Sequence, residues 1–176
     1  SLTTAPNEPM AESWAELLDY CDRSAAPVGR FLHDLNGEDA SLYPYSDALC
    51  NALQVINHLQ DCRKDFAEMD RVYLPEVWMR GDHGSAEQLS KPALSAGLRR
   101  VLDRALERVD TLLAEARRLA PNLRHRRLAA ETAVICALAE RLTTKLRRED
   151  PLATRVALSK PAMLATAVRG LLRLWL

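Results

Sequence analysis

The chain has 176 residues, of which 48% are hydrophobic and 27% charged, so it can bury the core of one compact domain. Lys and Arg (24) balance Asp and Glu (24), and aromatic residues make up 5%. This neutral, aromatic-poor composition argues against a nucleic-acid partner. No secretory signal or bilayer-spanning apolar run is visible, so we expect a cytoplasmic protein, with membrane association left open.

Alanine, leucine and arginine dominate, glycine is scarce and period-2 patterns are absent, which predicts an all-α fold. After a loose lead-in at residues 1–9, a first helix is expected from about Glu12 to Leu35. Pro27 should kink or split this helix near Ala25. The Asn36-Gly37 pair is a typical C-terminal stop.

The second helix is predicted from about Ser46 to Ala67, with Ser46 as its N-cap, and an extended DRVYLP patch follows. Residues 79–93 are rich in loop-forming residues. Two long helices are then expected, at about 94–119 and 123–148.

The last helix should open at Ser159-Lys160-Pro161 and run to the C-terminus. Its AVRGLLRLWL segment sets apolar residues against two arginines, namely Val168, Leu171, Leu172 and Trp175 against Arg169 and Arg173. Such a helix either docks on the core or lies on a membrane surface.

Four polar residues form one stripe on the second helix, because they are spaced by three, four and four positions: Gln54, Asn57, Asp61 and Asp65. Apolar residues border the stripe on both sides, as in the wall of a buried cavity rather than a solvated face. Like charges one turn apart weaken a helix unless a cation joins them. Paired carboxylates that hold Mg²⁺ against a phosphate group are therefore the chemistry this pair predicts.

Two neighbouring segments are further candidates. Arg71 and Tyr73 follow the acidic pair, and a planar guanidinium suits diphosphate oxygens. In SAAPVGRFL, Gly29 beside Arg30 permits close approach of a ligand or of another helix. Surface or edge positions for Arg71 and Tyr73, and a packing kink at Gly29, are the structural alternatives.

The remaining reactive side chains show no functional spacing. The four cysteines form no C-x-x-C pair, so we expect buried free thiols: Cys21, Cys50, Cys62 and Cys136. The four histidines share no metal-ligand spacing, and we expect them at the surface or the edge of the core: His33, His58, His83 and His125.

Two segments, YCDRSAAPVGRFL and DALCNALQVINHLQDCRKDFAEMDRVYLP, together resemble the squalene/phytoene synthases, which join isoprenyl diphosphates head to head. The second segment resembles that family's second aspartate-rich motif and its trailing R-x-Y-x-P. SAAPVGR and the later LSKPA are most similar to the bacterial hydroxysqualene synthases of hopanoid biosynthesis. The resemblance covers nearly the whole chain and implies an all-α isoprenoid synthase fold.

By this resemblance, the metal ligands for Mg²⁺ would be Asn57, Asp61 and Asp65, and the two acids would carry the catalysis. The substrate, presqualene or farnesyl diphosphate, would contact six residues: Gln54, Gln60, Arg71, Tyr73, Gly29 and Arg30. The implied reaction ionises presqualene diphosphate, rearranges the cation and quenches it with water. Squalene or phytoene formation, and a non-catalytic scaffold of the same fold, are the alternatives.

The sequence departs from the family pattern at three points. Gln60 stands where many relatives carry an arginine, and Asp70 stands where a turn glycine is common. The first aspartate-rich motif is missing, so the single helical domain, residues 1–176, resembles the C-terminal three-fifths of the enzyme. We therefore expect weak activity of the chain alone, and dimerisation or association with a separate N-terminal half.

Overall fold

A computed structural model describes residues 11–175, which form helices and turns without a strand. The expected all-α class is thereby confirmed. The helices in chain order are α1 (Trp14–Ser24), α2 (Ala26–Leu35), η1 (Ala40–Leu42), α3 (Tyr43–Met69), α4 (Glu76–Gly81), η2 (Ala86–Ser90), α5 (Ala96–Ala116), α6 (Leu119–Asn122), α7 (Arg126–Arg148) and α8 (Lys160–Trp175). The predicted lead-in, residues 1–9, and the Trp175 side chain lie outside the described part.

The break predicted in the first helix is present, because α1 ends at Ser24 and α2 begins at Ala26 with Pro27 in its first turn. Gly37 adopts a left-handed φ of 66° after α2, as the Asn36-Gly37 stop predicts. Ser46 as an N-cap is wrong. The short η1 runs directly into α3 at Tyr43, which leaves Ser46 buried inside the helix.

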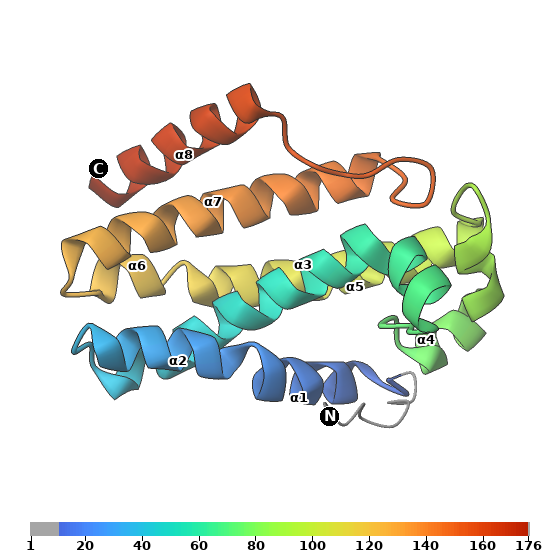
Figure 1. Cartoon of the computed structure of the whole chain (residues 1–176), viewed down its shortest axis with the longest axis horizontal. Coiled ribbons are helices and arrows are strands. Elements are labelled where there is room, and N and C mark those ends of the chain that lie inside the picture. Colours follow the sequence, from blue (N-terminus) through green and yellow to red (C-terminus); the bar gives the residue numbers. More distant parts are fainter. Residues whose placement is uncertain (1–10, 176) are drawn as a thin grey trace.

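The long helices lie in layers around α3 and α5 (Figure 1). α1 and α2 lie along one edge of the molecule, and α7 packs on α5 from the other side. α8 lies outside α7 at the opposite edge from α1 and α2 (Figure 1). The core between these layers is aliphatic, and Leu98, Leu102, Leu106 and Leu146 are among its fully buried side chains.

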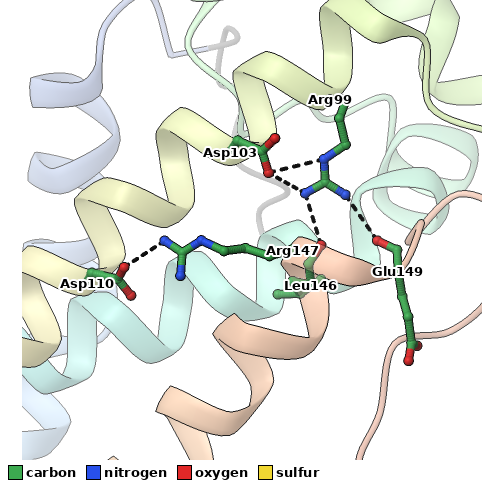
Figure 2. A network of polar contacts seen from close by, with 6 residues as sticks. All are labelled: Arg99, Asp103, Asp110, Leu146, Arg147 and Glu149. Carbon is green, nitrogen blue, oxygen red and sulfur yellow. Dashed lines mark hydrogen bonds and ion pairs between the residues drawn. The ribbon is translucent and has the colours of Figure 1, made fainter.

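Arginines join α5 to the C-terminal end of α7 (Figure 2). Arg99 donates to the carbonyl oxygens of Leu146 at 3.0 Å and Glu149 at 3.1 Å, and also to the Asp103 carboxylate at 2.6 Å. A guanidinium thus satisfies carbonyl groups that the end of a helix leaves without partners. Arg147 forms a second link, to Asp110, at 2.6 Å.

The segment between α3 and α5 contains two short helices, α4 and η2, of which η2 lies within the loop-rich residues 79–93. α4 occupies residues 76–81, and its Trp78 ring stacks on Trp14 of α1 with 5.6 Å between centroids. All four cysteines are free thiols, as expected, and three of them are buried, whereas Cys50 is half-buried. No helix within residues 11–175 has the length and apolar character needed to cross a bilayer.

Candidate active site

The predicted polar stripe lies along α3, but its burial changes from one end to the other. Asp65 is buried, with 9% of its surface exposed, Asp61 is half-buried and Asn57 is exposed. The expectation of a fully buried wall is therefore wrong for the described residues. The helical periodicity correctly predicted that the stripe runs along one helix. It did not predict the burial of each side chain, which depends on the elements that pack over α3.

The surroundings of Asp65 destabilise its ionised carboxylate. Its burial, and then the negative charge of Asp61, raise the pKa of Asp65 above its ordinary value. Lys64 and Arg71 oppose this shift without cancelling it. A divalent cation bound at Asp65 would stabilise its ionised form.

His58 links the stripe to the segment that follows α3. Its ring stacks on Tyr73 with centroids 3.5 Å apart, and its Nε2 lies 3.3 Å from the Gln54 side-chain nitrogen. Its Nδ1 lies 3.9 Å from an Asp65 oxygen. Burial lowers the pKa of His58 to about 4, so the ring is neutral at pH 7 and this contact is not an ion pair.

The chain leaves α3 through Asp70, which adopts a left-handed φ of 52° where a glycine would be unstrained. The turn brings Arg71 and Tyr73 back beside α1, and the Arg71 guanidinium lies 3.5 Å from the Tyr73 hydroxyl. Both side chains line a hollow of about 300 Å³ together with Tyr20 and Arg23 of α1. Glu16 and Asp19 of α1 line the same hollow, and Arg23 pairs with Asp19 at 3.0 Å, so an anion would compete with these acids for the arginines there.

Gln60 has a structural contact. Its amide donates to the carbonyl of Val156 at 2.6 Å, and Arg63 donates to the carbonyl of Leu152 at 2.7 Å. These bonds tie α3 to the loop between α7 and α8. Asp61 lines a shallow hollow beside this loop.

The structure places Gly29 and Arg30 at the contact between α2 and α3. A Cβ atom on Gly29 would lie 2.6 Å from Ser46 Oγ and 2.7 Å from Cys50 Sγ, so the glycine lets the two helices approach closely. Arg30 pairs with Asp47 through two nitrogens, at 2.9 and 2.5 Å. The packing alternative accounts for Gly29, and the prenyl-lining role of this segment stays a prediction.

Sequence reasoning missed two residues of this site, His58 and Tyr20. Both His58 and His33 are buried, so a surface or edge position was wrong for them, whereas His83 and His125 are exposed. The four-residue spacing from Gln54 to His58 could have indicated that their side chains are neighbours on the helix. Tyr20 lies 5.8 Å from Tyr73 between ring centroids, and no local pattern in the sequence indicated this contact.

The donor set of the stripe fits Mg²⁺. An amide oxygen and two carboxylates are hard oxygen ligands of the kind that Mg²⁺ prefers. Within residues 11–175, no cluster of three or more His, Cys, Asp or Glu side chains is arranged to hold a metal ion. The stripe therefore offers Mg²⁺ two acids and an amide.

The fold defines a class, that of the all-helical isoprenoid synthases. The chain superposes on a dehydrosqualene synthase with a TM-score of 0.86, covering 96% of this chain and 60% of that one at 18% identity. The chain belongs to the squalene/phytoene synthase family, whose family model matches residues 3–162.

Individual relatives agree with this assignment. The chain is 43% identical to the hydroxysqualene synthase of Zymomonas mobilis over 156 residues, which are 89% of this chain and 52% of the relative. It is 40% identical to that of Sinorhizobium fredii, over 89% of this chain and 54% of the relative. The crystal structure of squalene synthase HpnC from Alicyclobacillus acidocaldarius superposes with a TM-score of 0.75 at 31% identity. The superposition covers 81% of this chain and 54% of that one. The chain thus spans about half the length of these relatives.

Proposed function

We propose that this chain supplies the metal- and diphosphate-binding wall of a hydroxysqualene synthase of hopanoid biosynthesis. In this function, presqualene diphosphate ionises, its cation rearranges, and water quenches the product. The observation that carries the proposal is the buried Asp65, one turn from Asp61 on α3, followed by a non-helical segment whose Arg71 and Tyr73 line a hollow. Identity of 40–43% to hydroxysqualene synthases supports it.

Mg²⁺ held by Asn57, Asp61 and Asp65 would neutralise diphosphate charge and promote its departure as a leaving group. Arg71 has a guanidinium at the edge of the hollow, and it would donate hydrogen bonds to diphosphate oxygens there. Tyr73 would donate one more through its hydroxyl. His58 holds Tyr73 by ring stacking and therefore positions this donor.

A second helical part completes the proposed enzyme. α2 exposes a continuous apolar stripe at positions i, i+3, i+4 and i+7, whose side chains are 43–69% exposed: Val28, Phe31, Leu32 and Leu35. A stripe at this spacing is what a packed helix normally buries. We propose that further helices cover it, as expected for a chain about half as long as its relatives.

Calorimetric titration with a non-hydrolysable farnesyl diphosphate analogue tests the site. Wild-type protein should bind the analogue with Mg²⁺ and not with EDTA, and Asp61→Asn or Asp65→Asn should weaken binding at least tenfold. Glu68→Gln is the matched control, since it removes an exposed acid from the same helix. Equal binding with EDTA, or equal loss in the control, would contradict the metal site.

Squalene formation is the second candidate, because the solved relative at 31% identity is a squalene synthase. The two functions differ in the fate of the cation after diphosphate has left. Product analysis from presqualene diphosphate, with an N-terminal half supplied, would distinguish a C30 alcohol from a C30 hydrocarbon.

A further inference from the structure

Three hollows lie in a row between α7 and α8, which pack side by side (Figure 1). The first, of about 230 Å³, shares Glu140 and Arg173 with the second, of about 170 Å³. The second shares Arg141 and Thr144 with the third, of about 420 Å³. Because neighbouring hollows have walls in common, they form one continuous groove, which we call the α7–α8 groove.

Close helix packing and one shared carboxylate hold the walls of the α7–α8 groove in place. A Cβ atom at Gly170 of α8 would lie 2.9 Å from the Ala133 carbonyl oxygen of α7, so the two helices approach closely at one end of the groove. Glu140 accepts from Arg173 of α8 at 3.1 Å and from Arg117, which follows α5, at 2.6 Å. The groove therefore has its shape before any partner binds.

The α7–α8 groove is basic, although the chain as a whole is neutral. Six basic and two acidic side chains line it, namely Arg117, Arg141, Lys145, Arg148, Arg169 and Arg173 with Glu140 and Glu149. Its formal charge is therefore +4. Since the whole chain has 24 basic and 24 acidic residues, the 18 basic and 22 acidic residues outside the groove carry −4.

Three exposed arginines of the groove have no carboxylate partner. Within residues 11–175, no ion pair or side-chain hydrogen bond joins another residue to Arg141, Arg148 or Arg169. The two acids of the groove are already paired, Glu140 with two arginines and Glu149 with a lysine at 3.1 Å. The groove thus offers three guanidinium groups, and a planar guanidinium matches a carboxylate in geometry as well as in charge.

We propose that the α7–α8 groove binds an acidic segment of another polypeptide. The groove follows α7 from Ala133 to Arg148, about 22 Å at a rise of 1.5 Å per residue, which is the length of about six or seven extended residues. A segment of that length can place carboxylates on arginines of different hollows, and arginine clusters are a recurrent means of binding acidic motifs. No aromatic side chain of the described residues lines the groove, so nucleic-acid bases would find no stacking surface there.

Fluorescence anisotropy tests the proposal with the full chain in EDTA and a labelled ten-residue peptide that alternates glutamate with serine. At low ionic strength, this peptide should bind at least about tenfold more tightly than the same peptide with glutamine in place of glutamate. Salt at about 0.15 M should weaken the binding. Arg141→Gln with Arg169→Gln should lower the affinity about tenfold, since one exposed charge pair contributes up to about fivefold.

The matched control, Lys91→Gln with Arg108→Gln, removes two exposed positive charges outside the groove and should change the affinity by less than about twofold. All four substituted residues are exposed, and circular dichroism checks that both variants remain helical. Equal loss in the control, or equal binding of the glutamine peptide, would overturn the proposal. Tighter binding of a ten-nucleotide single strand would overturn it in favour of nucleic acid, and a dimer that the groove variant dissociates would overturn it in favour of a second copy. Because EDTA removes divalent metal, failure here is distinguishable from failure of the proposed Mg²⁺ site.

Discussion

Asp65→Asn should stabilise the metal-free protein while it removes metal-dependent binding. The reason is that burial and the Asp61 charge both raise the pKa of Asp65, so its ionised form destabilises the folded state. Like charges one helical turn apart cost about 0.2–0.5 kcal/mol. The partial loss of hydration adds to this, so the substitution should raise the free energy of unfolding by roughly 0.5–1 kcal/mol at pH 8.

The sign of the pH dependence follows from the direction of the shift. Below the ordinary carboxyl pKa, Asp65 is protonated in both the folded and the unfolded chain, and the wild type has no penalty. As the pH rises through the raised folded pKa, the wild type loses stability and the asparagine variant does not. The two proteins should therefore differ in stability at pH 8 and converge as the pH falls to the ordinary carboxyl range.

Thermal unfolding followed by circular dichroism in EDTA measures this difference. For a chain of this size, the expected gain corresponds to about 1–4 °C in Tm. Adding Mg²⁺ should then raise the Tm of the wild type and leave that of Asp65→Asn unchanged. Glu68→Gln on the same helix should change stability by less than about 0.5 kcal/mol. A variant less stable than the wild type at pH 8 in EDTA would show that the Asp65 charge is already neutralised by protein partners.

Three further outcomes are expected. Asp70→Gly should raise the free energy of unfolding by about 1 kcal/mol in urea titrations, because it relieves the left-handed conformation at φ 52°. A destabilised variant would indicate that the Asp70 side chain makes a stabilising contact in the folded chain. Gly29→Ala should lower the free energy of unfolding by about 1–2 kcal/mol in the same titrations, because its Cβ would lie 2.6 Å from Ser46 Oγ. An unchanged urea midpoint would refute the close packing of α2 on α3. Phe31→Ser should weaken any self-association seen by sedimentation equilibrium, since this ring is 63% exposed on the α2 stripe; association that persists would place the contact elsewhere.

The sequence was sufficient for the long helices and for the alignment of the polar stripe along α3. The positions of Gln54, Asp61 and Asp65 follow from a period of 3.6 residues, which is a local property. Ser46 was misplaced because the preceding η1 turn, capped by the Asp39 side chain, continues into α3 and moves its start to Tyr43. Helix starts depend on such neighbouring turns, so a capping residue type alone does not fix them.

The depth of the site could not be predicted in the same way. Asp65 is buried and Asn57 is exposed, although both belong to one stripe. The difference arises because the segment after α3 folds back over one end of the helix and brings the Tyr73 ring over His58. Burial of this kind depends on contacts between residues that a helical pattern does not relate.

The stack of His58 on Tyr73 also explains how the site holds its shape. A segment without helical hydrogen bonds, residues 71–75, has few local constraints on its backbone. The neutral His58 ring gives it a flat apolar contact at 3.5 Å, and neutrality is required because a charged ring would be expensive to bury. Arg71 lines the hollow and also lowers the pKa of Asp65, so it partly offsets the negative charge of that buried acid. His58→Phe preserves the stack and should therefore retain analogue binding within about threefold, whereas His58→Ala should lose most of it.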